Sequence, residues 1–394
     1  MSAGVRALVR TRTTGTPSAR LQDWLLTSAL PLWSQAGLDP DGGFFERIDA
    51  GAGAVRGPRR ARVLGRQIYA YARAPALGWT GPAAGVVRHG LARLPAFVRP
   101  DGLVQSRLDD AGRPLEAPID LYDQAFILFG TAHAVDVVGG DALPAFAASM
   151  RAALARFAHP LGGYEEALPR TLPLRANPHM HLLEAGLAWE ARTDGPERAA
   201  WAGFCDGIVR LALDRMIDPA TGALHEHFDG DWHRATAPDL AVVEPGHQFE
   251  WAWLLTRWGE ARGDDRALTA ADRLREIGEG HGVDASGLTI AELGPDLAVQ
   301  AGHARLWAQG ERAKAWAQRA LRVEGAARTD ALDRMEAACA ALMRFVTDTP
   351  AGGWRDRITA DGVAVEEAAP ASSLYHIVGA VEETAGATGS APIP

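Results

Sequence analysis

The sequence predicts an all-α protein made of one domain, and three features of the chain support this fold class. Apolar residues recur at helical spacing, as in residues 21–33, where Leu21, Trp24 and Leu25 begin a broad apolar stripe. Loops rich in Gly and Asp, such as DPDGGFFE and HPLGGYEEA, recur at an interval of about 60 residues. No segment rich in Pro, Gly or Ser divides the chain. The length fits six helical hairpins, whose simplest closed arrangement is a ring of inner helices inside a ring of outer helices.

The predicted elements are mostly helices, joined by loops that contain short β-hairpins. The segment DGLVQSRLD with AGRPL, and the segment GALHEHFDGDW, each predict a small hairpin. Abundant alanine favours helix formation and close packing between helices. After the helix at 21–33, further helices are expected to begin near Arg60, Ala84, Leu121, Leu143, His179, Arg198, Gln248, Ala267, Gln300, Glu311, Asp330 and Ser373.

Both ends of the chain are predicted to lie outside the folded domain. Residues 1–20 carry four arginines, no acidic residue and several hydroxyl side chains, which is typical of a basic tail and also of a transit peptide. The last residues, TAGATGSAPIP, are small and polar. We therefore expect a disordered basic tail at 1–19, a single catalytic domain at 20–386 and a disordered tail at 387–394.

Composition excludes several classes of partner. The 394 residues carry a net charge of −9, so the chain lacks the basic surface that nucleic acid or an anionic membrane requires. No run approaches 18 apolar residues, and no transmembrane helix is expected. Cys205 and Cys339 match no metal-binding spacing and fit reduced core cysteines of a cytoplasmic protein. No glycine-rich nucleotide motif is present, and no cofactor is expected.

The most informative segment is EPGHQFEWAWLL, at 244–255. A Pro and a Gly precede a helical run in which His247 and Glu250 share one face. Histidine has the unperturbed side-chain pKa closest to neutral pH, and the positive end of a helix dipole favours its neutral, basic form. The segment PASSLYHI, at 370–377, places His376 in a similar first turn. Two such histidines predict proton transfer on a small molecule.

Two further helix starts share this design. In NPHMHLLEA, Asn177 can cap the helix, and His181 and Glu184 then share a face. In DLYDQAF, Tyr122 lies in the first turn after a capping Asp. Helix N-termini that converge on one cavity supply hydrogen-bond donors and partial positive charge for an oxyanion. Each residue taken alone is more often a packing or capping group, but the combination indicates a functional site.

A metal site is not predicted. His179 and His181 are two residues apart on a helix and point to opposite sides, so they cannot bind one ion together. His225 and His227 can share one face of a strand, with His233 nearby. No Cys or carboxylate spacing completes a site around them.

Two tryptophan segments suit a carbohydrate ligand. RLWAQGE and GGWRD place Trp307 and Trp354 beside charged and amide side chains. The C–H faces of a sugar stack on aromatic rings while its hydroxyls bind polar groups. Most of the 12 tryptophans are expected to be ordinary core or rim residues.

Six segments together resemble the N-acylglucosamine 2-epimerase superfamily, which includes cellobiose 2-epimerases, mannose isomerases and sulfoquinovose-type aldose–ketose isomerases. The resemblance runs from about Trp33 to Tyr375 and is highly specific for the superfamily. It implies an (α/α)6 barrel of paired inner and outer helices with short β-hairpins in the loops. The third and fourth segments are most similar to the mannose isomerase branch. In order, the segments are RVLGRQIYAYARA, LYDQAF, NPHMHLLEA, EPGHQFEWAWLL, RLWAQGE and PASSLYHI.

The resemblance also implies roles for individual residues. It makes His247 and His376 the acid/base pair and places Arg66 near the substrate carbonyl. Relatives usually have Pro and Thr where this chain has Ala308 and Gly310, which puts the loop shape and the size of the sugar in doubt. The residues implied to bind the sugar are Tyr122, Asn177, His181, Glu250, Trp307, Gln309, Glu311, Trp354 and Asp356.

The predicted function is a cofactor-independent isomerase that interconverts D-mannose and D-fructose by proton transfer through a cis-enediolate. A sugar 2-epimerase of the N-acylglucosamine or cellobiose type is the nearest alternative. A glycoside hydrolase stays open because the chain offers several carboxylates, those of Asp123, Glu184, Glu250 and Glu311. A non-catalytic sugar-binding module is the remotest alternative. The predicted partner is a small-molecule sugar. Tolerance of a phosphate group stays open, although no basic cluster marks a phosphate site, which favours neutral sugars. The oligomeric state also stays open, with a homodimer as one alternative.

Overall fold

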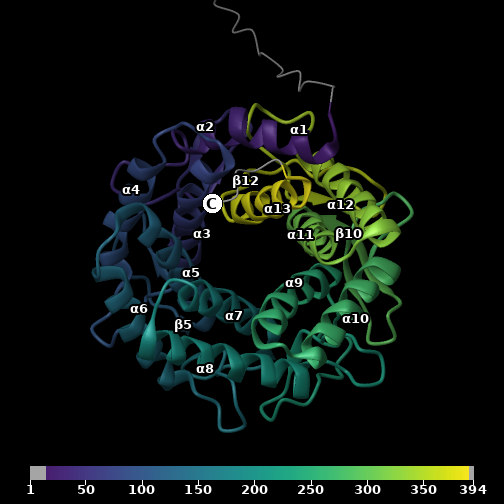
Figure 1. Cartoon of the computed structure of the whole chain (residues 1–394). Helices are drawn as coiled ribbons and strands as arrows, with labels where there is room; N and C mark the ends of the chain where they lie inside the picture. Colours follow the sequence, from purple (N-terminus) through teal and green to yellow (C-terminus); the bar gives the residue numbers. More distant parts are fainter. Residues whose placement is uncertain (1–14, 390–394) are drawn as a thin grey trace, which may run out of the picture.

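The helices of the chain form two concentric rings, as the computed structural model of residues 15–389 shows (Figure 1). Each inner helix packs against the next one along the chain, and the last packs against the first to close the ring. This arrangement confirms the (α/α)6 barrel. The inner helices are α3 (Ala61–Arg73), α5 (Leu121–Val138), α7 (Ala176–Glu190), α9 (Pro245–Arg262), α11 (Leu306–Arg322) and α13 (Ser373–Thr388).

The outer ring covers the apolar outward faces of the inner helices. Trp189 of the inner ring stacks on Trp201 of the outer ring, with 6.0 Å between the ring centroids. Both side chains are buried, and aromatic groups of this size contribute much of the apolar burial between two layers. The outer helices are α1 (Pro17–Trp24), which continues through a π-helical turn (Leu25–Ala29) into α2 (Leu30–Trp33), then α4 (Ala83–Phe97), α6 (Ala142–Ala153), α8 (Gly195–Leu211), α10 (Asp265–Gly282) and α12 (Gly325–Val346).

Short antiparallel strand pairs form a collar around one end of the barrel. Four strands run directly into an inner helix, and a fifth ends two residues before α13. Each of the five pairs with a strand from a neighbouring loop. The collar therefore sets the N-termini of the inner helices at the same end. Its pairs are β12 (Ala369–Pro370) with β1 (Arg47–Ile48), β3 (Arg59–Arg60) with β4 (Arg107–Leu108), β5 (Ile119–Asp120) with β6 (Ala167–Leu168), β7 (Leu174–Arg175) with β8 (His227–Phe228), and β10 (Val299–Arg305) with β11 (Arg357–Ile358). Strands β2 (Ala54–Val55) and β9 (Ile290–Leu293) extend the first and the last of these pairs.

One buried polar side chain in the first turn of four inner helices holds a loop of the collar. Each binds the backbone of a single loop residue, whose polar groups would otherwise be buried without a partner. Gln309, which the sequence assigned to sugar binding, accepts from the Thr289 N–H at 2.8 Å and donates to the Thr289 carbonyl at 2.9 Å. The oxygen and the nitrogen of the Gln309 amide are therefore both bound to the backbone of the collar. The pairs are Gln124 with Val104, His179 with Tyr164, Gln248 with Leu224, and Gln309 with Thr289.

Two glycines allow α3 and α5 to approach closely. A Cβ atom on Gly65 would lie 2.0 Å from the carbonyl oxygen of Phe126, and one on Gly130 would lie 2.4 Å from the carbonyl oxygen of Gly65. Only glycine permits this approach, because any side chain would overlap the facing backbone. The contact fixes the position of Arg66, the next residue of α3, along the helix axis relative to α5.

The structure corrects two of the sequence expectations. Separate helices were expected to begin near Gln300 and Glu311, but residues 299–305 form strand β10, and one helix begins at Leu306. The pairing of β10 with β9 and β11 holds this segment extended despite its helix-forming alanines.

None of the helices in the described part of the chain is long and apolar enough to cross a membrane.

The helical region also extends beyond the predicted domain limits of 20 and 386. It begins at Pro17 and ends at Thr388. Thr16 caps the first helix by accepting from the Ala19 N–H, and the Ser18 hydroxyl donates to Glu336 of α12 at 2.5 Å. The remainder of the two predicted tails, residues 1–14 and 390–394, lies outside the described residues.

We expect Gln309→Ala to lower the free energy of unfolding by about 2–4 kcal/mol, because it removes buried hydrogen bonds and leaves Thr289 unpaired. Urea denaturation followed by circular dichroism measures the change. Gln300→Ala is the control, because the Gln300 amide binds the Pro238 carbonyl on the exposed surface. Its expected loss stays within about 0.5 kcal/mol. Equal losses in the two variants would contradict the anchoring role of Gln309.

Candidate active site

The structure brings His247 and His376 to one aromatic side chain at the collar end of the barrel. The ring centroid of Trp307 lies 4.9 Å from that of His247 and 5.7 Å from that of His376. The three residues come from the first turns of α9, α11 and α13. The histidines are 4% and 6% exposed, while Trp307 is half-buried. Two imidazoles that are far apart in the sequence therefore converge on the same small region.

His247 is bound by two carboxylates. Its Nδ1 lies 2.9 Å from Oε2 of Glu226 and 3.4 Å from Oε2 of Glu244. Burial acts to lower the pKa of His247, but these carboxylates outweigh it and raise the pKa to about 10. The ring is therefore protonated at neutral pH, and the expectation of a neutral imidazole is wrong. With Nδ1 occupied, Nε2–H is the proton available to a ligand.

His376 has the opposite protonation state. Its Nδ1 lies 2.7 Å from Oε1 of Glu311, whose Oε2 lies 2.7 Å from Nζ of Lys314. Burial lowers the pKa of His376 to about 4, although Glu311 partly opposes this shift. Burial alone would raise the pKa of Glu311, but the ammonium of Lys314 and the His376 hydrogen bond lower it. Glu311 is thus an anion that accepts from Nδ1–H, and Nε2 keeps a free lone pair.

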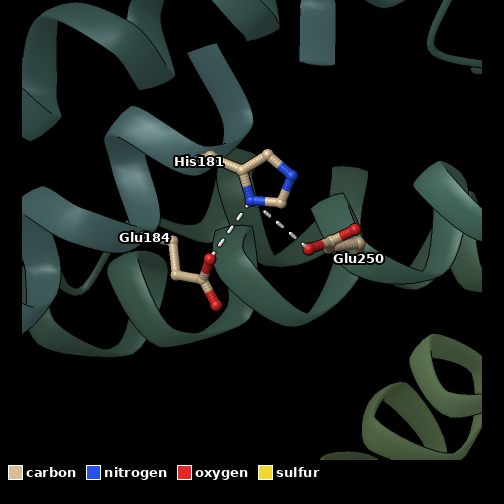
Figure 2. A group of neighbouring side chains, drawn as sticks. All are labelled: His181, Glu184 and Glu250. Carbon is tan, nitrogen blue, oxygen red and sulfur yellow. Dashed lines mark hydrogen bonds and ion pairs between the residues drawn. The ribbon is translucent and has the colours of Figure 1, made fainter. Parts of the chain in front are cut away.

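A second cluster, of His181, Glu184 and Glu250, joins α7 to α9 (Figure 2). Nδ1 of His181 lies 3.2 Å from Oε2 of Glu184 and 3.8 Å from Oε1 of Glu250. Burial raises the pKa of Glu184 to about 7. Burial and the Glu311 carboxylate raise the pKa of Glu250 well above its usual range. This shift favours the protonated form of Glu250. Its buried Oε2 has no hydrogen-bond partner among the described residues, so it can bind a ligand hydroxyl.

Arg66 supplies positive charge to the same region. Its guanidinium stacks over Phe126 at 4.0 Å and donates to the Tyr122 hydroxyl at 2.6 Å. Within residues 15–389 no carboxylate forms an ion pair with Arg66, whereas the neighbouring Arg62 is paired with Asp123 at 2.7 Å. A guanidinium without an acidic partner retains donors for an anionic intermediate.

The cluster includes most, but not all, of the residues predicted from the sequence. Asn177 lies one turn before His181 on the same face of α7, with no hydrogen bond at its buried Oδ1. Trp354 is instead buried against the outer ring, where it stacks on Trp33 with 4.6 Å between centroids. Asp356 accepts from the Ser373 hydroxyl at 2.9 Å and pairs with an arginine, so it holds the start of α13. Neither Trp354 nor Asp356 joins the cluster around the histidines.

Sequence reasoning missed four residues that set the charges of this cluster. Glu226 and Glu244 favour the protonated form of His247. Lys314 favours the ionised form of Glu311. The Tyr375 hydroxyl donates to Glu184 at 2.5 Å. The i, i+3 spacing of Glu311 and Lys314 was a usable signal. Glu226 belongs to a hairpin loop, and no linear pattern connects it to His247.

Three sets of His and Glu place their ligand atoms within 4.8 Å of one another. The ammonium of Lys314 is already paired with one of these carboxylates, that of Glu311, at 2.7 Å. The expectation that the site works without a metal stays a prediction. The sets are His181 with Glu184 and Glu250, Glu226 with Glu244 and His247, and Glu250 with Glu311 and His376.

Comparison with known proteins shows that this chain is similar to sugar isomerases and epimerases. The sequence profile of the N-acylglucosamine 2-epimerase (GlcNAc 2-epimerase) family matches residues 43–380. A mannose-6-phosphate isomerase of Rhizobium meliloti (strain 1021) is 43% identical over 372 residues, which cover 93% of this chain and 96% of that protein.

Solved structures of similar proteins share the fold. A D-mannose isomerase matches with a TM-score of 0.85 at 18% identity, over 95% of this chain and 100% of that chain. The cellobiose 2-epimerase of Bacillus thermoamylovorans B4167 matches with a TM-score of 0.81 at 16% identity, over 93% and 98% of the two chains.

The opposite protonation of the two histidines can be tested by nitrogen NMR of the labelled imidazoles. At pH 8 we expect two ring N–H groups on His247, whose pKa is raised to about 10, and one on His376. Glu226→Gln should bring the pKa of His247 toward its ordinary value of about 6.5 by removing the nearer carboxylate. Glu244→Gln is the control and should lower this pKa less, because that carboxylate is farther away and more exposed. A neutral His247 in the unmodified protein at pH 8 would refute this account.

Proposed function

The chain belongs to the N-acylglucosamine 2-epimerase family of isomerases and epimerases, and we propose that it interconverts D-mannose and D-fructose without a cofactor. The observation that carries this proposal is the pair of histidines packed on Trp307, one neutral and one charged. A base and an acid beside one aromatic ring suit proton transfer at the sugar carbon next to a carbonyl.

In the proposed first step, the open-chain aldose lies with its carbonyl oxygen O1 near Arg66. Nε2 of His376 removes the proton from C2, and the electron pair of that bond forms the C1–C2 double bond of a cis-enediolate. The negative charge then lies on O1. Arg66 and the Nε2–H of His247 donate hydrogen bonds to this anion, which stabilises it in a buried environment.

In the second step, the protons are redistributed to give the ketose. His247 gives its proton to O1 and takes the proton of the C2 hydroxyl, and the C2 oxygen becomes the new carbonyl. His376 returns its proton to C1. Both histidines then regain their starting protonation states. Return of a proton to the opposite face of C2 instead would give the C2 epimer, which is the reaction of the alternative 2-epimerase.

The substrate proposed is unphosphorylated, although the 43% identical relative is named a mannose-6-phosphate isomerase. Four arginines around the collar are already paired with carboxylates. The guanidinium of Arg66 has no carboxylate partner among the described residues and donates to the Tyr122 hydroxyl. These four paired arginines are therefore not free cations for a phosphate dianion. The neutralised pairs are Arg60 with Glu46, Arg62 with Asp123, Arg175 with Glu166, and Arg305 with Asp356.

The proposed function is tested by incubating the purified protein with D-mannose in heavy water and recording NMR spectra. We expect D-fructose carrying deuterium at C1, and much slower conversion of D-mannose 6-phosphate. His247→Asn and His376→Asn should each lower kcat by roughly 10²–10⁴-fold, because a positioned acid or base contributes this much. A product epimerised at C2 would identify the 2-epimerase instead. Faster turnover of the phosphorylated sugar would contradict the neutral substrate.

The glycoside hydrolase alternative gives a different pattern in the same assay series. Glu250 donates or accepts a hydrogen bond in the isomerase, whereas a hydrolase requires carboxylates as its acid and nucleophile. Hydrolysis of a glycoside that Glu250→Gln abolishes and His376→Asn leaves intact would therefore replace the isomerase proposal. Thermal denaturation of each variant controls for loss of folding.

We expect a broad plateau in the pH profile of kcat/KM. Activity should rise with pH as His376 loses its proton near pH 4, and fall as His247 loses its proton near pH 10. Glu226→Gln should move the alkaline limb toward neutral pH and leave the acidic limb in place. An unmoved alkaline limb would assign it to another group.

The folding stability of the unmodified protein and of the Glu226→Gln variant should be measured in parallel. The pKa of His247 is raised on folding, so its contribution to stability is complete below about pH 6.5 and is lost as the pH approaches 10. Denaturation curves at each pH show how much of the loss of activity comes from unfolding and how much from titration of His247.

A further inference from the structure

Lys314 is a buried cation on an inner helix, and the proposed reaction gives it no step of its own. It lies in α11 one turn after Glu311, and its side chain is 3% exposed. Its Nζ lies 2.7 Å from Oε2 of Glu311 and 3.9 Å from the centroid of the Trp253 ring. Burial acts to lower the pKa of Lys314, but the surrounding carboxylates outweigh burial and raise it, so the ammonium stays charged.

The charge of this ammonium acts on three carboxyl groups, those of Glu184, Glu250 and Glu311. Among the described residues, only Glu311 forms an ion pair with it. The Tyr375 hydroxyl instead donates to Glu184 at 2.5 Å and to Glu250 at 3.4 Å. Burial raises the pKa values of Glu184 and Glu250, whereas the ammonium lowers that of Glu311 in spite of burial. One buried cation therefore favours one buried anion, and the contact assigns this anion to Glu311.

The ionisation of Glu311 decides which nitrogen of His376 carries a hydrogen. Oε1 of Glu311 lies 2.7 Å from Nδ1 of His376. A carboxylate only accepts hydrogen bonds, so a neutral imidazole beside it carries its hydrogen on Nδ1 and keeps the lone pair of Nε2.

One additional proton on this pair of groups removes the base. Either the carboxylic acid of Glu311 donates to Nδ1 and the imidazole hydrogen lies on Nε2, or the imidazole carries both hydrogens beside the carboxylate. Nε2 has no free lone pair in either arrangement. His376 can therefore act as a base only while the pair holds a single proton.

We propose that Lys314 is a positioning residue for the base, because its ammonium keeps Glu311 ionised and thereby keeps the lone pair of His376 on Nε2. The inference rests on the proposed function only in assigning the role of base to His376. The Glu311 carboxylate lies between the ammonium and the imidazole, so Lys314 acts through Glu311.

No other cation within residues 15–389 forms an ion pair with Glu311. Burial lowers the pKa of His376 most and the charge of Arg66 adds to this shift, but Arg66 donates to the Tyr122 hydroxyl. The loss of Lys314 would thus leave Glu311 without a paired cation. The titratable or charged groups that surround the pair from the neighbouring helices are Arg66, His181, Glu184, His247, Glu250 and Tyr375.

Three variants separate the charge of Lys314 from its packing. Lys314→Met keeps a side chain of similar length and removes the charge, whereas Lys314→Arg keeps the charge. Arg257→Met is the matched control for loss of a cation. The Arg257 guanidinium also lies over the Trp253 ring, at 4.9 Å, but it pairs with Glu383 at 3.2 Å.

The first measurement is a pH titration of the labelled His376 imidazole by nitrogen NMR, which requires no substrate. In the unmodified protein, Nε2 should lose its hydrogen as the pH rises through about 4. In Lys314→Met this step should lie about 1–3 pH units higher, because a charged neighbour at such a distance shifts a pKa by this amount. Lys314→Arg and Arg257→Met should titrate as the unmodified protein does.

The second measurement is the pH profile of kcat/KM for whichever aldose the enzyme converts. The acidic limb of Lys314→Met should move upward by the same amount as the titration of His376, and activity should recover above the new limb. The alkaline limb should stay in place, because His247 is paired with other carboxylates. A purely structural role of Lys314 would lower activity equally at every pH.

An unshifted titration of His376 in Lys314→Met would overturn the proposal, and so would an equal shift in Arg257→Met. A hydrogen on Nε2 of neutral His376 in the unmodified protein at pH 7 would overturn it without any variant. Lys314→Gln is a second variant without the charge, in case Lys314→Met does not fold. Failure to convert D-mannose counts only against the proposed substrate, because the NMR titration does not depend on turnover.

Discussion

The site depends on one constraint, which is that the six inner helices enter the barrel from the same end. The strand collar imposes this direction, because four of its strands continue directly into an inner helix and a fifth ends two residues before α13. The positive ends of the helix dipoles then surround a single region, which favours an anion there. The same constraint brings the first turns of α9, α11 and α13 together, so that His247, Trp307 and His376 meet although they are far apart in the sequence.

The two histidines occupy similar positions but are opposite in charge, and their neighbours explain the difference. His247 faces the carboxylates of Glu226 and Glu244, which together exceed the cost of burying a cation. His376 faces one carboxylate, Glu311, whose charge is shared with Lys314. Buried charges of this kind rarely add stability, so such a cluster is more readily explained by its chemistry. Because its members are coupled, replacing one of them shifts the protonation of the others.

Much of the fold and of the site could be predicted from the sequence, because helix starts leave local signals. Caps, prolines and first-turn histidines marked α7, α9 and α13, and their likeness to one another indicated a shared site. Contacts between distant segments left no such signal. Trp354 lies in a loop and Gln309 in the first turn of α11, and the direction of each side chain depends on the outer ring or the collar. The charge of His247 was mispredicted because a helix dipole, at about 0.3–1 kcal/mol, is weaker than two close carboxylates.

The carbon and the face at which the intermediate is reprotonated determine whether isomerisation or epimerisation occurs. We therefore expect the collar, rather than the barrel, to determine the product. His376 is fixed by Glu311 and Lys314 of one inner helix, so its relation to C1 and C2 is set by rigid packing. His247 is oriented by Glu226, which precedes strand β8 in a hairpin loop. Loops vary in length and conformation more readily than helices do. A displaced hairpin would turn His247 from the oxygens of the enediolate toward the second face of C2, so one barrel can support either outcome.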